Sequence, residues 1–155
     1  MDNTNTNWCQ SVTAVVIKDK KVLLARHTYG SGAGKLIIPG GYVNFGEAPQ
    51  DAVKREYMEE TGIEIAPQSI IGIRFNVKCW YIAFRADYVS GEAQSDGNEN
   101  CEVIWLDVQE ALSRDDVPGL TKHLIRSALS PAPGLSFHPD YITKESLAPY
   151  SLYCL

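Results

Sequence analysis

One stretch of the chain, from Gly41 to Ile63, constrains the fold more than any other. It reads GYVNFGEAPQDAVKREYMEETGI and joins a glycine-containing turn to a run rich in glutamate. Pro49 suits the first turn of a helix, where the N–H that proline lacks would have no partner. Gly62 suits the left-handed residue that follows a helix, and Ile63 supplies the apolar contact expected there. We therefore predict a helix over roughly residues 49–61.

The glutamates of this helix oppose its own electrostatics. At 100° per residue, Glu56, Glu59 and Glu60 project within an arc of roughly 100° on one face. Glu56 and Glu60 are an i,i+4 pair of like charge, which costs a helix about 0.2–0.5 kcal/mol. All three lie in the C-terminal half, where the helix dipole disfavours negative charge. Such a cluster is either a solvated acidic face or a site for a hard divalent cation, which prefers oxygen ligands.

The pattern of the whole stretch resembles the box that defines the Nudix hydrolase family, which includes the MutT-like proteins. The box is G-x5-E-x7-R-E-U-x-E-E-x-G-U, where U is apolar, and the chain matches every fixed position and the last apolar one. The matching residues are Gly41, Glu47, Arg55, Glu56, Glu59, Glu60, Gly62 and Ile63. Tyr57 departs from the family, which usually has a smaller aliphatic residue there, and we expect its ring to pack inward.

The resemblance implies an α/β/α sandwich around a mixed β-sheet, and hydrolysis of a diphosphate linkage between a nucleoside and another group X. Nucleoside triphosphates, nucleotide sugars and ADP-ribose-like molecules are the expected nucleotide-type substrates. By resemblance, Glu56 and Glu60 are the principal metal ligands, with Glu59 beside them, and Gly41 lets the backbone approach the site. Mg²⁺ is the expected cofactor, with Mn²⁺ as an alternative. The rival hypothesis is a Nudix-fold sensor that binds a nucleotide without turning it over, which a degraded box would favour.

Other box residues imply further roles. Arg55 and Glu47 resemble the pair in which an arginine orients a glutamate and steadies the loop. The general base is left open among Glu59, Glu99 and Glu102, because family members differ on this point. A base must lie within hydrogen-bond reach of its water, and that is a matter of geometry.

Outside the box, β-branched and alternating runs predict strands. We expect them at residues 12–17, 22–26, 36–38, 63–66, 70–75, 77–89 and 102–106. Asp107 is expected to cap a short helix, and the apolar spacing of residues 120–129 predicts another with one buried face. The aromatic side chains of Trp80, Tyr81 and Phe84 are expected to pack in the core. Together these elements indicate a layered α/β or α+β domain.

A glycine-rich loop at residues 27–35, HTYGSGAGK, ends in Gly34-Lys35. It is not a phosphate-binding P-loop, because Tyr29 occupies the position of the first glycine and Leu36 that of the Ser or Thr. Two interpretations stay open: an ordinary loop, or a flap from which Arg26, His27 or Lys35 touches substrate.

The 155 residues are enough for one domain, expected over residues 1–155, with the tail from about residue 131 packing on the domain or on a partner in a homodimer. The net charge of −5 disfavours general nucleic-acid binding. The sequence lacks a membrane-spanning run and a signal-peptide pattern, so we expect a cytoplasmic location. The scattered Cys9, Cys79, Cys101 and Cys154 do not predict a zinc site.

Overall fold

The computed structural model describes residues 9–76, 79–138 and 152–154. The strands are β1 (Cys9–Lys18), β2 (Lys21–His27), β3 (Leu36–Ile37), β4 (Gly40–Tyr42), β5 (Ile63–Phe75), β6 (Cys79–Gly91), β7 (Asn100–Asp107), β8 (Leu135–Phe137) and β9 (Tyr153–Cys154). The helices are α1 (Pro49–Thr61), α2 (Val108–Ser113) and α3 (Gly119–Leu129), and a short 3₁₀ turn, η1, spans Gly30–Gly32.

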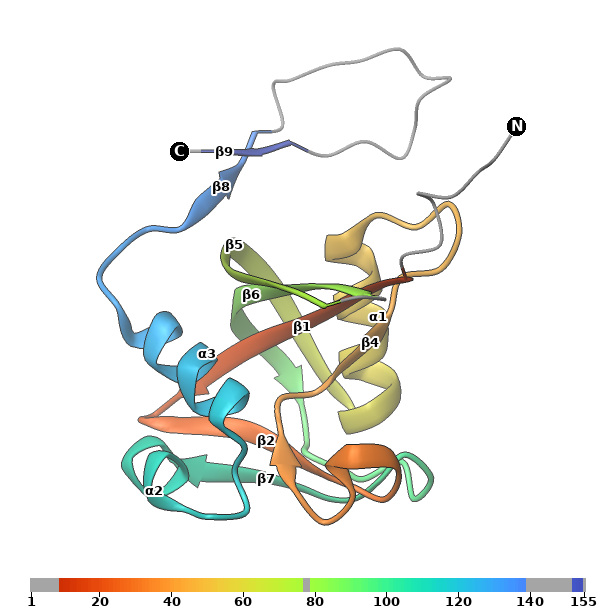
Figure 1. Ribbon diagram of the computed structural model, residues 1–155, viewed down its shortest axis with the longest axis vertical. Coiled ribbons are helices and arrows are strands. Elements are labelled where there is room, and N and C mark those ends of the chain that lie inside the picture. Colours follow the sequence, from red (N-terminus) through yellow and green to blue (C-terminus); the bar gives the residue numbers. More distant parts are fainter. Residues whose placement is uncertain (1–8, 77–78, 139–151, 155) are drawn as a thin grey trace.

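The described strands form one mixed sheet. Its order is β3-β2-β1-β6-β5-β8-β9, with β4 also paired to β1 and β7 to β2. The pairing of β1 with β6 is parallel, whereas β1 pairs with β2 and β4 in the antiparallel sense. Figure 1 shows α1 on one side of the central strands and α3 on the other. The chain is therefore an α/β/α sandwich around a mixed sheet, which confirms the predicted fold class.

A tight hairpin connects β1, which pairs with β4 and β6, to β2, which pairs with β3 and β7. Lys18 pairs with Lys21, which leaves only Asp19 and Lys20 in the turn. Both residues have positive φ, 50° and 62°, as a two-residue hairpin turn whose twist matches its strands requires. The strands predicted at residues 12–17 and 22–26 are confirmed, and β2 runs on from the turn to pair with β3 and β7.

Strand β1 is buried on both faces because a hydrophobic cluster lies on each side of it. Val12, Ala14 and Val16 belong to the cluster that packs against α1. Val15 points the opposite way, into the cluster that includes Ile125 of α3. A strand covered on both faces needs apolar residues at successive positions rather than in alternation, which explains the run VTAVVI in the sequence.

Helix α1 has the predicted bounds and the predicted ends. Pro49 is its first residue, and Gly62 follows it in the left-handed conformation with φ of 69°. Ile63 is fully buried directly after it. Tyr57 is also fully buried, and its hydroxyl donates a hydrogen bond to the carbonyl oxygen of Ala14 in β1. The expected inward packing of Tyr57 is confirmed, and its polar end is satisfied by the backbone of the central strand.

One expectation about the β5–β6 hairpin was confirmed and extended, and another was wrong. The segments 63–66 and 70–75 are both extended and belong to one strand, because β-bulges near Pro67 and Gly72 absorb the irregular residues without ending the pairing with β6. Trp80 is 46% exposed rather than in the core. It lies near the end of the sheet and packs edge-on against Phe75, with ring centroids 5.1 Å apart.

The helical predictions after β7 were partly confirmed. Asp107 caps α2 by accepting hydrogen bonds from the backbone N–H groups of Gln109 and Glu110, at 2.9 and 3.1 Å. In α3 the apolar positions of the predicted stripe, 120, 124, 125, 128 and 129, are only partly buried. Leu124 and Ile125 are buried, whereas Leu120 and Leu129 are exposed and Thr121 takes an inward position.

The described part of the C-terminal region contacts the domain. Strand β8 pairs with β5, and β9 pairs with β8. The ring of Tyr153 in β9 packs edge-on against Phe84, at 5.6 Å between centroids. Tyr141 and Tyr150, which the sequence marks as aromatic tail residues, lie outside the described residues. Among the described helices, none has the length and apolar character needed to cross a bilayer.

The contact between Tyr57 and β1 predicts a measurable stability effect. In Tyr57→Phe the ring still fills its site, but the buried carbonyl of Ala14 loses a donor, so we expect a loss of about 1–2 kcal/mol in the free energy of unfolding. Urea unfolding followed by circular dichroism measures this loss. Tyr42→Phe, at a 65% exposed tyrosine, is the control and should change stability by less than about 0.5 kcal/mol. Equal stability of Tyr57→Phe and the unaltered chain would contradict the proposed role of the hydroxyl.

Candidate active site

Arg55 of α1 holds the acidic residues of the box together. Its Nε and Nη2 donate to the two carboxylate oxygens of Glu47 at 2.8 and 2.9 Å, and Nη2 also donates to the carbonyl oxygen of Tyr42 at 3.0 Å. Its Nη1 donates to Glu56 at 2.7 Å and to Glu59 at 3.1 Å. The guanidinium holds the pKa of Glu47 below its ordinary value. One side chain thereby fastens the turn before α1 to the helix itself.

Gly41 leaves room for the carboxylate of Glu56. A Cβ at this position would lie 2.3 Å from Cδ of Glu56 and 2.4 Å from its Oε2, so a larger residue would displace the carboxylate. Glu56 thus rests directly on the backbone of β4. Burial raises the pKa of this carboxyl group, and the neighbouring guanidinium of Arg55 partly opposes that rise.

Glu60 is the most buried of the box glutamates, with 3% of its surface exposed. Its Oε2 accepts a hydrogen bond from the backbone N–H of Gly40 at 3.2 Å, whereas its Oε1 has no partner among the described residues. Burial raises the pKa of Glu60 to about 8, and the carboxylates of Glu56 and Glu99 add to the rise against the Gly40 N–H. A buried carboxylate oxygen without a donor is costly, so this position needs a proton or a cation.

These residues fit a hard divalent cation. The unpaired Oε1 of Glu60 and the partly buried carboxylate of Glu56 are oxygen donors of the kind that Mg²⁺ prefers. Glu59 lies beside them, and its side chain is more exposed than that of Glu56. Within the described residues, no three His, Cys, Asp or Glu side chains already meet in the geometry of a metal site. Arg55 bonds to one oxygen of Glu56 and to one of Glu59.

The structure separates the two acidic candidates that follow the box. Glu99 lies in the loop before β7, close enough that its charge adds to the raised pKa that burial gives both Glu56 and Glu60. Its Oε2 accepts a hydrogen bond from the hydroxyl of Tyr29 at 2.9 Å. Glu102 lies on β7 and pairs instead with Arg26 of β2, at 2.7 Å between Nε and Oε2.

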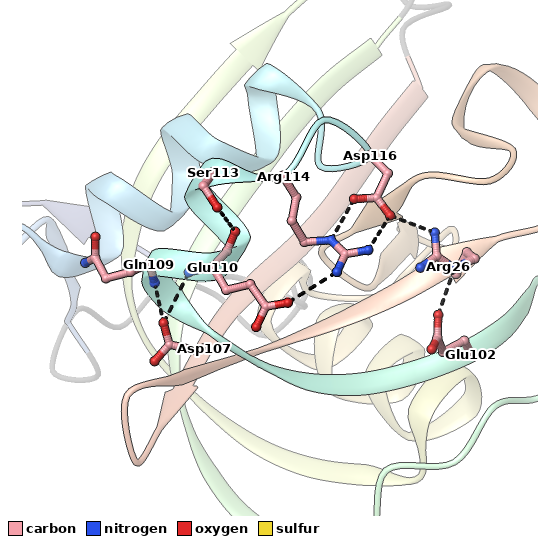
Figure 2. Close-up of polar contacts among 8 residues, drawn as sticks. All are labelled: Arg26, Glu102, Asp107, Gln109, Glu110, Ser113, Arg114 and Asp116. Carbon is pink, nitrogen blue, oxygen red and sulfur yellow. Dashed lines mark hydrogen bonds and ion pairs between the residues drawn. The ribbon is translucent and has the colours of Figure 1, made fainter.

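Glu102 belongs to a network of ion pairs (Figure 2). Arg26 reaches Asp116 at 3.0 Å as well as Glu102, and Arg114 holds the same Asp116 through two contacts of 2.8 Å. Arg114, and then Arg26, keep the pKa of Asp116 well below its ordinary value. Arg26 also donates to the carbonyl of Gly34 at 2.9 Å. The network braces the glycine-rich loop, so Arg26 is already engaged within the protein.

Two residues that the sequence did not single out hold the Glu99 loop in place. The buried side chain of Asn100 donates from Nδ2 to the carbonyl oxygen of Glu60 at 2.9 Å, which ties the loop to the end of α1. Asp96 accepts from the backbone N–H groups of Asn98 and Asn100, at 2.9 and 3.1 Å. The polar run SDGNEN predicts such a capped turn. The run does not predict that Asn100 bonds to the carbonyl oxygen of Glu60 in α1.

Comparison with known proteins identifies the family. The family model for the NUDIX domain matches residues 8–127, and the chain therefore belongs to the Nudix hydrolase family. It is 30% identical over 148 residues to the NAD-capped RNA hydrolase NudC of Vibrio atlanticus (strain LGP32), across 91% of this chain and 49% of that protein. The chain spans less than half the length of such curated relatives.

Solved structures agree with this assignment. The MutT protein from Methanosarcina mazei Go1 is 29% identical, with a TM-score of 0.64 over 79% of this chain and 93% of its own. A NUDIX hydrolase from Nitrosomonas europaea is 22% identical and reaches a TM-score of 0.75, over 91% of this chain and 99% of its own. The second comparison extends the shared fold to most of the chain.

The buried Glu60 makes the stability of the cation-free protein depend on pH. The folded chain keeps the Glu60 proton up to about pH 8, whereas an unfolded chain releases it near pH 4.3. This contribution to stability is therefore complete below the unfolded pKa and is lost as the pH rises through about 8. We expect the urea midpoint, measured with a chelator, to fall between about pH 5 and about pH 8, and to fall less in Glu60→Gln. Identical pH profiles for the two proteins would contradict this assignment.

Proposed function

We propose that this chain is a Mg²⁺-dependent pyrophosphohydrolase that cleaves the diphosphate linkage of a nucleoside diphosphate joined to a second group. The observation that carries the proposal is the unpaired, buried Oε1 of Glu60 beside the carboxylate of Glu56. Arg55 donates to Glu56, whereas no donor among the described residues reaches Oε1 of Glu60. A diphosphate brings further negative charge, so substrate and carboxylates need a cation between them.

The residues of the site take distinct roles in this reaction. Glu56 and Glu60 hold the metal ion, with Glu59 beside them, and the Arg55–Glu47 pair keeps the turn in position. When bound, the divalent cation neutralises phosphate charge and lowers the pKa of a water molecule. The remaining task of the protein is to orient that water and to accept its proton, because phosphoryl transfer depends mainly on positioning and charge neutralisation.

Glu99 is the best-supported general base of the three candidates. Glu102 is held by the guanidinium of Arg26, and Glu59 by that of Arg55. Glu99 instead accepts a hydrogen bond from a neutral hydroxyl, that of Tyr29. A carboxylate that is not paired with a guanidinium is more available to take a proton from water. Its charge also acts on Glu56 and Glu60, so it faces the side of the site where the metal is proposed.

The group on the far side of the diphosphate defines the substrate class. The likeness to NAD-capped RNA hydrolase NudC supports including NAD-type dinucleotides in a substrate panel, next to nucleoside triphosphates, nucleotide sugars and ADP-ribose. The net charge of −5 supports a small nucleotide over a long nucleic acid. Incubation of the panel with Mg²⁺ and identification of the products by chromatography tests the substrate class.

The metal-binding roles predict a loss of activity in two single variants. Glu56→Gln and Glu60→Gln keep the shape of each side chain but remove its charge, so we expect each to lower kcat by about 100-fold or more. Glu110→Gln, on the exposed face of α2, is the control and should keep near-normal activity. Near-normal hydrolysis by both site variants would reject the proposal. Tight nucleotide binding without turnover by the unaltered chain would favour the sensor hypothesis.

The choice of base predicts a ranking among three variants. Removing a general base costs about 100-fold or more in kcat, so Glu99→Gln is expected to lose this much with little change in KM. Glu102→Gln and Glu59→Gln are expected to lose less, because each carboxylate is engaged by an arginine. Initial rates at saturating substrate and saturating Mg²⁺ give the comparison. A larger loss in either of the other two variants would move the role of base to that residue.

A further inference from the structure

The glycine-rich loop and the Glu99 loop are joined along their backbones. The N–H of Thr28 donates to the carbonyl oxygen of Glu99 at 3.1 Å, and the Thr28 hydroxyl donates to the carbonyl of Asn98 at 2.7 Å. These bonds follow directly on the last pair of the β2–β7 ladder, His27 with Asn100. The pairing of β2 with β7 therefore determines that Tyr29, which follows Thr28, lies opposite Glu99.

The Tyr29 side chain makes a specific contact from this position. Its hydroxyl donates to Oε2 of Glu99 at 2.9 Å, and in the described residues no other hydrogen bond to this carboxylate is found. Burial, the hydrogen bond to Glu99 and the charge of Glu60 raise the pKa of Tyr29 to about 12, so the phenol stays protonated and remains a donor. The ring of His27 flanks that of Tyr29, with centroids 5.7 Å apart.

This contact restrains the carboxylate through one of its two oxygens. A hydrogen bond to Oε2 limits how far the carboxylate can rotate, and so narrows the positions open to the second oxygen of Glu99. A base works when its free oxygen lies within about 3.2 Å of the water that it deprotonates. A freely rotating glutamate on a loop would hold that geometry for only part of the time.

We infer that Tyr29 is a positioning residue, which holds Glu99 so that its free oxygen faces the metal-bound side of the site. This inference rests on the proposed function and adds the glycine-rich loop to the machinery of the reaction. The role of this loop is thus to present a hydroxyl to the base, rather than to bind phosphate as a P-loop does. In this role Tyr29 acts through Glu99 and does not itself contact the water or the diphosphate.

A double-variant cycle tests the inference. Tyr29→Phe keeps the ring and removes the hydroxyl, so we expect kcat to fall about tenfold with KM unchanged, which corresponds to a loss of transition-state interaction only. In the Glu99→Gln background the same change should have no further effect on kcat, because the positioned base is already gone. Tyr88→Phe, which removes a surface hydroxyl bonded to the carbonyl of Gly91, is the matched control and should leave kcat unchanged.

Three outcomes would overturn the inference. One is a normal kcat in Tyr29→Phe. Another is a raised KM with normal kcat, which would make Tyr29 a substrate contact. The third is an independent loss of kcat when Tyr29→Phe is added to Glu99→Gln. If the unaltered chain turns over no nucleotide, the proposed function fails. Urea unfolding of the unaltered chain, Tyr29→Phe, Glu99→Gln and the double variant then tests whether Tyr29 and Glu99 interact. Additive midpoint shifts would then reject this interaction, and non-additive shifts would support it.

Discussion

The turn before α1 and the C-terminal half of that helix are held together by one guanidinium. Arg55 donates to three carboxylates and a backbone carbonyl, and without it the acidic side chains of the box would repel one another across a short distance. Its bonds to Glu47 fix the turn, and the turn sets the path of β4. Strand β4 in turn supplies the bare backbone at Gly41 on which Glu56 rests. The position of each glutamate follows from this chain of contacts.

Helix α1 serves the core and the site with neighbouring residues. Tyr57 is buried against β1, and Glu60, three residues later, is buried at the edge of the same face. A hydroxyl can be buried when one backbone carbonyl accepts its proton, whereas a carboxylate needs more than the single N–H that Gly40 provides. The packing of α1 thus holds the Glu60 carboxyl group at a buried position, where the Gly40 N–H alone does not stabilise its charge.

The sequence predicts the fold class and the bounds of α1, because proline, glycine and the spacing of apolar residues act locally. It also predicts the pairing of Arg55 with Glu47 through the family resemblance. It does not decide between Glu99 and Glu102, because the difference depends on the partner that each meets in the fold: Tyr29 on the neighbouring loop for one, and Arg26 on the paired strand β2 for the other. The exposure of Trp80 has the same origin, since its aromatic character is visible in the sequence and its position at the end of the sheet is not.

The parallel pairing of β1 with β6 has a consequence for the order of folding. Cys9 lies opposite Cys79 in this pairing, so two segments far apart in the chain must meet before the centre of the sheet exists. Non-local pairing of this kind is slow compared with helix formation. A peptide cut to the box alone would be a short acidic helix without the strand that covers Tyr57, and such helices are marginal in water. The arrangement of the box glutamates therefore depends on contacts between distant parts of the chain, even though most of these residues are neighbours in the sequence.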